Sequence, residues 1–230
     1  MGEIPFRIKK ISFFGYFIRF NAILYHFLRY ISSPKLNFFQ RKVYFIMKRL
    51  NCSQIAAGNW LALNRITYCD NKGVERIWES VTRKKSAGAV AIICRLLPSD
   101  RLILVRQYRP PVDGMVIEFP AGLVNPGEDP NETAVRELRE ETGYHGRLIR
   151  MIPDAFSSPG MSSEIVRLAV MEADENAQGE LITDFDETED IETILVKFAD
   201  LENFLQEAGR RGDQVDGRVS AFALGLGFPR

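Results

Sequence analysis

The chain contains little histidine and cysteine, and this excludes several enzyme classes. His26 and His145 are the only histidines among 230 residues, too few for a His-rich metal site or a His-based triad. The three cysteines, at positions 52, 69 and 94, are odd in number and lack paired spacing. That pattern argues against a disulfide framework and a zinc site. We therefore expect a protein of the reducing cytoplasm.

The chain also lacks net charge and a long uninterrupted apolar run. Lysine plus arginine and aspartate plus glutamate number 30 each, so no overall field attracts nucleic acid. The longest apolar stretch, residues 11–31, is interrupted by Arg19, His26 and Arg29, whereas a membrane-spanning helix needs about 20 largely uncharged residues. We therefore expect neither nucleic-acid binding nor a transmembrane helix.

Residues 1–46 differ in composition from residues 47–230, which we expect to form the folded domain. They hold 13 of the 25 aromatic residues and carry a net charge of +7. Translation starting at Met47 would remove them; otherwise they form a basic, aromatic segment on a membrane surface, or an appendage that is disordered or packed on the domain. The abrupt change of composition favours the first interpretation, and an intact-mass measurement of the native N-terminus would test it.

The stretch from Gly122 to Tyr144 organises the rest of the chain. Its first eight residues are rich in turn formers, and a helical pattern begins at Pro130. Asp129 suits the N-cap, Pro130 suits the first helical position, and Gly143 suits a left-handed C-cap. The sequence therefore predicts a loop followed by a helix that ends near Gly143.

Carboxylates cluster on this helix. Glu137 and Glu141 are four residues apart and share a face, with Glu140 beside them. Like charges at this spacing destabilise a helix by roughly 0.2–0.5 kcal/mol per pair. A divalent cation such as Mg²⁺, which prefers oxygen ligands and binds together with substrate phosphates, would explain the cluster. Taken alone, the helix favours the more common interpretation, a solvated acidic face.

The spacing of the whole stretch is more specific. Gly122 is followed after five residues by Glu128, and after seven more by Arg136-Glu137-Leu138, then Glu140-Glu141 and Gly143. This pattern resembles the Nudix box, the signature of the Nudix hydrolases, at every fixed position. The resemblance implies an α/β fold, an α/β/α sandwich with a mixed β-sheet. It also implies that Mg²⁺ or Mn²⁺ supports hydrolysis of a nucleoside diphosphate joined to another group.

The same resemblance gives roles to the residues of the box. It implies that Glu137 and Glu141 are the main metal ligands and that Glu140 assists them. Glu128 is implied to hold the loop against Arg136, and Gly122 opens the box.

Before the box, a β-hairpin is predicted. Residues 60–68 and 74–82 are rich in strand formers and flank the turn Asp70-Asn71-Lys72-Gly73. The hairpin carries both tryptophans, Trp60 and Trp78. Each either fills a core or an interface, or stacks on a nucleobase, where stacking contributes roughly 1–3 kcal/mol per base.

Three segments narrow the resemblance to the ADP-ribose (ADP-sugar) pyrophosphatase subgroup of the family: residues 78–83, 107–111 and 117–122. Similarity extends from Trp60 to the C-terminus. The resemblance implies that Trp60 and Trp78 stack on adenine from opposite subunits of a homodimer and that Glu79 bonds the adenine edge. It implies that Arg83 and Arg109 bind the ribose–phosphate part. The Ala121 carbonyl is implied to be a metal ligand.

Residues 184–192 are densely acidic and form either a solvated loop or a loop that carries a catalytic base. Hydrolysis of a diphosphate needs a group that deprotonates the attacking water. By position in the subgroup, Glu189 matches best, and Glu187 and Glu192 compete with it.

The predicted reaction is cleavage of ADP-ribose to AMP and ribose 5-phosphate. Ser158 stands where subgroup members carry an acidic residue, so ADP-glucose, GDP-mannose or an oxidised nucleoside diphosphate remain alternative substrates. A third alternative is a non-catalytic module that binds ADP-ribose. Such modules typically lose glutamates of the box, whereas all four are present here.

Overall fold

The computed structural model describes residues 46–187 and 189–227. The predicted N-terminal extension, residues 1–46, therefore lies outside the described residues except for Ile46. Within the described ranges, no helix combines the length and apolar character needed to cross a bilayer.

A small antiparallel sheet begins the described chain. Its strands are β1 (Lys48–Ala57), β2 (Leu61–Cys69) and β3 (Glu75–Arg83), in that order. The predicted hairpin is confirmed, because β2 and β3 pair without interruption around a turn in which the Asp70 carboxylate accepts the N–H groups of Lys72 and Val74. Strand β1 was not predicted. It makes the hairpin part of a three-stranded sheet.

The main sheet has eight strands in mixed orientation. Six follow the order β11-β6-β5-β4-β9-β8, while β10 pairs with β5 and β7 pairs with β4. The β4–β9 and β6–β11 pairs are parallel, and the other pairs are antiparallel. The strands are β4 (Ala89–Leu97), β5 (Arg101–Arg109), β6 (Gly114–Glu118), β7 (Ala121–Leu123), β8 (Arg147–Phe156), β9 (Ile165–Asp174), β10 (Ile191–Lys197) and β11 (Gln214–Val215).

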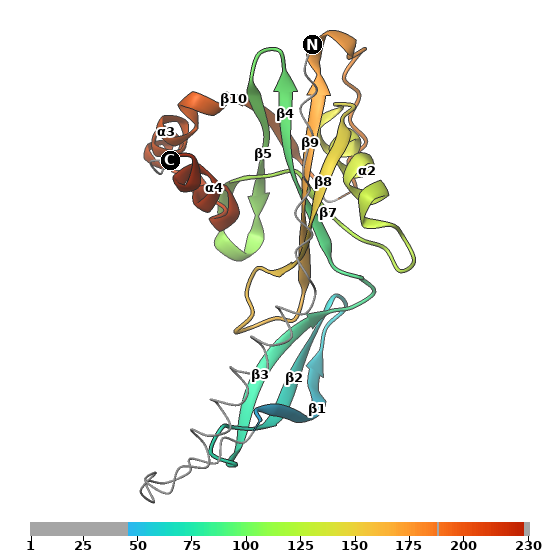
Figure 1. The fold of residues 1–230 in the computed structure, drawn as a ribbon, viewed down its shortest axis with the longest axis vertical. Helices are drawn as coiled ribbons and strands as arrows, with labels where there is room; N and C mark the ends of the chain where they lie inside the picture. Colours follow the sequence, from blue (N-terminus) through green and yellow to red (C-terminus); the bar gives the residue numbers. More distant parts are fainter. Residues whose placement is uncertain (1–45, 188, 228–230) are drawn as a thin grey trace, which may run out of the picture.

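Helices cover both faces of this sheet (Figure 1). Helix α2 (Pro130–Thr142) lies on one face, and α3 (Leu201–Arg211) and α4 (Gly217–Gly227) lie on the other. Successive side chains of β4 serve the two layers, since Val90 and Ile92 pack in the core under α2 and Ala91 packs in the core under α3 and α4. The predicted α/β/α sandwich is therefore confirmed. Short 3₁₀ turns occur at η1 (Pro110–Val112), η2 (Glu175–Ala177) and η3 (Phe198–Asp200).

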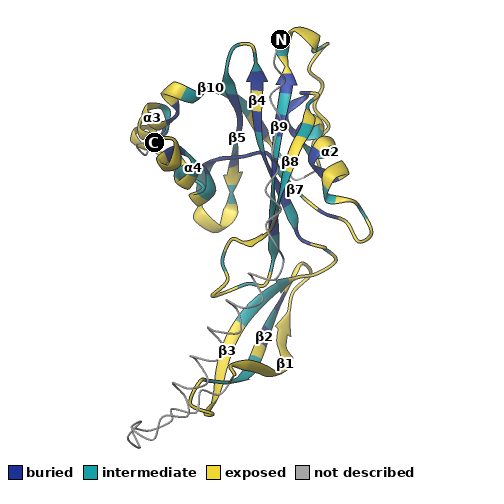
Figure 2. Ribbon diagram, viewed as in Figure 1, coloured by how far each residue is buried: buried dark blue, intermediate teal, exposed yellow. Residues whose placement is uncertain are grey.

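The small sheet extends from one end of the main domain (Figure 1), and Figure 2 shows it largely exposed. The loop between β8 and β9 attaches it. The Trp78 indole Nε1 donates to the Gly160 carbonyl at 2.8 Å, and the Val81 N–H donates to the Met161 carbonyl at 2.9 Å. These bonds fix β3 against the end of the domain where β4 begins.

Candidate active site

Helix α2 has the predicted boundaries. The Asp129 carboxylate accepts the Asn131 N–H at 2.9 Å, which satisfies one of the free donors of the first turn. Gly143 has φ +73° and donates its N–H to the Arg139 carbonyl, so it ends the helix in the left-handed conformation that glycine adopts without strain. The helix therefore presents Glu137 and Glu141 in a fixed orientation.

The backbone of β7 approaches this acidic face closely. The Ala121 N–H donates to Glu141 Oε2 at 3.0 Å, and Glu141 is only 2% exposed. A Cβ atom on Gly122 would lie 1.8 Å from Glu137 Cδ. Position 122 therefore excludes every side chain as long as Glu137 keeps this position.

Arg136 joins the loop of the box to the helix. Its guanidinium contacts Glu128 through Nε at 2.9 Å, and its Nη1 lies 2.8 Å from both Glu137 and Glu140. The hydrogen bond from Arg136 is the main reason that the pKa of Glu128 is lowered to about 2. The Glu140 carboxylate, predicted to assist metal binding, is directed at Arg136.

Burial raises the pKa values of the two central carboxyls. The pKa of Glu137 rises to about 7 and that of Glu141 to about 8, chiefly because both side chains are shielded from water, and further because of the negative charge of Glu189. A buried acid and a partly buried acid next to each other are stabilised by a cation, and their oxygens are the donors that Mg²⁺ prefers.

A divalent ion fits this donor set. In the described part of the chain, no three His, Cys, Asp or Glu side chains stand together as a ready metal cluster. Mg²⁺ is usually held by one or two carboxylates, waters and substrate phosphates. Glu137 and Glu141, with the adjoining backbone of Ala121, supply this small number of protein ligands.

A cleft of about 1010 Å³ opens over this face. The predicted site residues that line it are Arg83, Arg109, Ala121, Gly122, Arg136, Glu137 and Glu189. Glu128, Glu140 and Glu141 do not line it but lie behind these groups. Trp60, Trp78 and Glu79 are not part of the lining: Trp78 and Glu79 lie on β3, and Trp60 lies directly before β2.

Two arginines of the cleft are oriented by carboxylates that the sequence analysis did not identify. Arg83 Nε donates to Glu164 at 2.6 Å. Arg109 binds Glu118 through Nε at 2.8 Å and Nη2 at 2.7 Å. Glu118 was detectable as a single acid in an apolar strand, but Glu164 lies 81 residues from Arg83 and no local pattern marks it.

The start of α4 forms another wall of the cleft. Asp216, Gly217, Arg218 and Ala221 line it, and Arg218 is paired with Asp216. No expectation from the sequence assigned a role to Asp216 or Arg218.

Of the three acids considered for the catalytic base, Glu189 lines the cleft. Its Oε2 accepts the Asp186 N–H at 3.0 Å, which orients the carboxylate. Glu187 is exposed, and Glu192 lies on β10 with its carboxylate 3.2 Å from Arg106. The loop that carries Glu189 is attached to α2, because the Asp184 N–H donates to the Glu140 carbonyl at 2.8 Å.

Neither tryptophan fills the core of this chain, so the core alternative is wrong, while the interface alternative stays a prediction. Trp60 is 76% exposed and Trp78 is 48% exposed. The backbone carbonyl of Trp60 accepts a hydrogen bond from the backbone N–H of Lys84. Lys84 lies six residues after Trp78 in the sequence. That separation corresponds to about 20 Å along an extended strand. The two rings of one chain therefore do not close on the same base. Glu79 is also exposed, next to Trp78 on β3.

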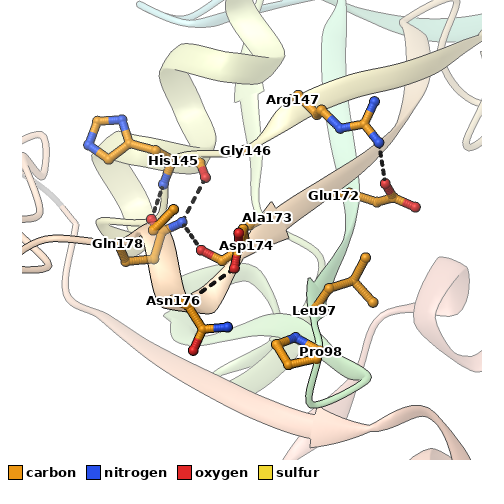
Figure 3. A pocket seen from close by; sticks show the side chains of 11 residues that line it. Leu97, Pro98, His145, Gly146, Arg147, Glu172, Ala173, Asp174, Asn176 and Gln178 are labelled. Carbon is orange, nitrogen blue, oxygen red and sulfur yellow. Dashed lines mark hydrogen bonds and ion pairs between the residues drawn. The ribbon is translucent and has the colours of Figure 1, made fainter.

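A second hollow, of about 640 Å³, lies at the opposite end of β4 (Figure 3). Gln178 braces it by hydrogen bonds to the His145 backbone and to the Asp174 carbonyl. It contains none of the predicted site residues. The chemistry that the sequence predicts is therefore concentrated in the cleft beside α2.

Comparisons with known proteins agree with this geometry. The NUDIX domain profile matches residues 85–215. The ADP-ribose pyrophosphatase of Saccharomyces cerevisiae is 36% identical over 179 residues, covering 73% of this chain and 77% of that protein. The ADP-sugar pyrophosphatase of Mus musculus is 44% identical over 116 residues, covering 47% and 53%. The crystal structure of an ADP compounds hydrolase shares the fold, with a TM-score of 0.52 and 21% identity over 71% of this chain and 84% of that one.

Proposed function

This chain belongs to the Nudix family of hydrolases, and from that premise we propose that it cleaves ADP-ribose to AMP and ribose 5-phosphate. The observation that carries the proposal is the cleft, in which Glu137 of α2 shares one cavity with Arg83 and Arg109. Guanidinium groups suit the oxygens of a diphosphate, and the buried carboxyls suit a divalent ion. The names of the yeast and mouse relatives support this substrate class.

Glu137, Glu141 and the Ala121 carbonyl would hold the ion, with Glu140 near enough on the same helix to assist. When bound, Mg²⁺ neutralises charge on the diphosphate and lowers the pKa of a coordinated water. Mn²⁺ has the same preference for oxygen and would serve in its place. Glu128 and Arg136 support the site from behind by keeping the loop on the helix.

Glu189 is the proposed general base. The water oxygen bonds to one phosphorus, the bridging P–O bond breaks with its electron pair on the departing phosphate, and the water proton passes to Glu189. The Asp186 N–H holds the receiving carboxylate in place. Arg83 and Arg109 orient the diphosphate for this attack, each held by its own glutamate.

The adenine is proposed to lie between Trp60 of one chain and Trp78 of a second copy, with Glu79 at its edge. Exposure of both rings and their separation within one chain support a shared clamp. The small sheet also exposes Leu50, Ile55 and Ile77, which a homodimer would cover. Light scattering is expected to give twice the mass of one chain, and Ile77→Asp is expected to give monomers with a raised KM. An active monomer with an unchanged KM would contradict the shared clamp.

We also propose that the enzyme acts in the cytoplasm. Cys52, Cys69 and Cys94 are all free in the structure, which suits a reducing compartment.

Product analysis tests the reaction. The purified protein is incubated with Mg²⁺ and, separately, ADP-ribose, ADP-glucose, GDP-mannose and 8-oxo-dGDP, and the nucleotides are resolved by chromatography. AMP from ADP-ribose, absent with Glu141→Gln, is the expected result. Turnover of another compound alone would replace the substrate but keep the site, and ADP-ribose binding without any turnover would indicate a sensor.

A further inference from the structure

The first turn of α4 is held rigidly beside the cleft. The Asp216 N–H donates to the Ile117 carbonyl at 3.0 Å, which ties the turn to the strand that carries Glu118. The Asp216 carbonyl accepts the Ser220 N–H at 3.0 Å, and the Asp216 carboxylate accepts the Arg218 N–H at 2.7 Å. These bonds cap the helix through its backbone.

The Arg218 side chain is oriented as well. Its Nε donates to Asp216 Oδ1 at 2.9 Å and its Nη2 donates to Oδ2 at 3.0 Å, a two-point contact that fixes the plane of the guanidinium. A guanidinium has five N–H donors, so three remain. Among the described residues, no other acceptor is hydrogen-bonded to this group, and Arg218 lines the cleft.

Arg218 lines the same cleft as the two arginines already assigned to the substrate. Burial lowers the pKa of Arg218, but the hydrogen bond and the charge of Asp216 raise it, and the charges of Glu118 and Glu164 raise it further, so both glutamates lie within electrostatic range. Glu118 is the partner of Arg109, and Glu164 is the partner of Arg83. The three guanidinium groups therefore line one cleft, each with a carboxylate that orients it.

Capping of α4 does not explain why residue 218 is an arginine. The cap requires the Asp216 carboxylate and the backbone N–H of residue 218, which any residue except proline supplies. A long cation whose remaining donors line a cavity is a feature of ligand binding. A diphosphate bound by Arg83 and Arg109 would share the cleft with these donors.

We propose that Arg218 is a third guanidinium that binds the diphosphate, and that Asp216 is the residue that positions it. This assignment rests on the proposed function, since it presupposes a diphosphate substrate in the cleft. It accounts for the charged pair at the start of α4, a helix that otherwise contributes to the core.

Steady-state kinetics of Arg218→Gln, Arg218→Lys and Asp216→Asn test the assignment, with Arg106→Gln as the matched control. Arg106 pairs with Asp213 and Glu192 but does not line the cleft. With ADP-ribose and Mg²⁺, Arg218→Gln is expected to lower kcat/KM about 10- to 100-fold, as loss of a charge-assisted hydrogen bond does. Arg218→Lys should recover part of this loss, Asp216→Asn should cost about 3- to 10-fold, and Arg106→Gln less than about twofold.

Competitive inhibition separates phosphate binding from a structural role. Arg218→Gln is expected to weaken inhibition by ADP about tenfold or more and to leave inhibition by adenosine unchanged. Equal weakening of both inhibitors, or a lower Tm with unchanged kcat/KM, would overturn the assignment. Loss of ADP-ribose turnover with unchanged ADP inhibition would also overturn it, because Arg218 would then contact the sugar.

The wild-type enzyme distinguishes the two proposals. If it cleaves a different nucleoside diphosphate compound and leaves ADP-ribose intact, the proposed function fails, and the same variants are measured on the compound that is cleaved. If it cleaves ADP-ribose and Arg218→Gln behaves like Arg106→Gln, only the role of Arg218 fails.

Discussion

The two sheets of this protein differ in how much of their surface the same chain buries. Strand β4 of the main sheet buries Val90, Ile92, Cys94 and Leu96 under α2 and Ala91 under α3 and α4. In the small sheet, every residue of β1 is exposed. The only buried residues of this sheet are Ala62 and Asn64, both on β2. A sheet of three strands with so little burial is marginal by itself.

The two sheets also differ in the proposed functions of the residues near them. Glu137 and Glu141, which are proposed to bind the metal, lie on the helix that covers one core, and such packing fixes side chains to within fractions of an ångström. The aromatic rings proposed for recognition lie where the chain leaves apolar surface exposed. Catalytic geometry would then be a property of one chain, and adenine binding a property of two.

The strongest test of this division is Glu141→Gln, which removes a buried charge from the main domain. We expect kcat to fall by at least about 10³-fold, while the oligomeric state and the circular dichroism spectrum stay unchanged. Glu132→Gln, on the exposed side of the same helix, is the control and should retain full activity. Retained activity in Glu141→Gln would remove this glutamate from the catalytic machinery.

Gly122→Ala tests whether backbone packing in the main domain controls the chemistry. The added methyl would overlap the Glu137 carboxyl, so either β7 or that side chain must move. We expect kcat/KM to fall about 100-fold and the free energy of unfolding to fall by about 1–3 kcal/mol. Gly179→Ala, where a Cβ meets no atom within 4 Å, should change neither quantity.

Trp60→Ala and Trp78→Ala test the small sheet. Each is expected to raise KM about tenfold and to leave kcat nearly unchanged, because base stacking is worth roughly 1–3 kcal/mol. Mixed dimers of the two variants sharpen the test. If each clamp combines Trp60 of one chain with Trp78 of the other, a mixed dimer has one intact clamp and regains up to half of the activity at low substrate. A clamp within one chain would regain none.

The smallest expected effect is a dependence of stability on pH that arises in the main domain. Because burial raises the pKa values of Glu137 to about 7 and Glu141 to about 8, the folded metal-free protein favours their neutral forms. Their contribution to stability is therefore present at low pH and is lost as the pH rises through 7 and 8.

Calorimetry at pH 6.0 and 8.5 checks this dependence. We expect Tm of the metal-free protein to be about 2–5 °C lower at pH 8.5, and Mg²⁺ to raise Tm more at pH 8.5 than at pH 6.0, since it binds the deprotonated carboxylates. Glu141→Gln should reduce both differences. An Mg²⁺ effect that is larger at pH 6.0 would contradict the assigned ligands.

Local signals predicted the parts of the site that are local in sequence. Asp129 and Gly143 mark the ends of α2 by hydrogen bonds within a few residues, and the turn at Asp70–Gly73 sets the pairing of β2 and β3. Strand β1 was missed because none of its residues is buried, so it has no apolar alternation that reveals a strand.

Pairs that form between distant segments could not be predicted in this way. Arg83 and Glu164 meet only because the loop between β8 and β9 folds back onto β3. The place of Arg218 in the cleft depends on how α4 lies against β6, which its own sequence does not specify. No local pattern around Asp216 and Arg218 indicated a site, and only the surrounding cleft connects these charged residues with one.

The contact between Gly122 and Glu137 has a consequence for how such a chain evolves. As long as the glutamate keeps its place beside β7, any side chain at position 122 would overlap its carboxyl group, so we expect such a mutation to displace Glu137 and to lower activity. A lineage that lost the glutamate would lose this restriction as well, and larger residues would accumulate at position 122. The identity of residue 122 in a descendant sequence would then record whether its ancestors continued to catalyse the reaction.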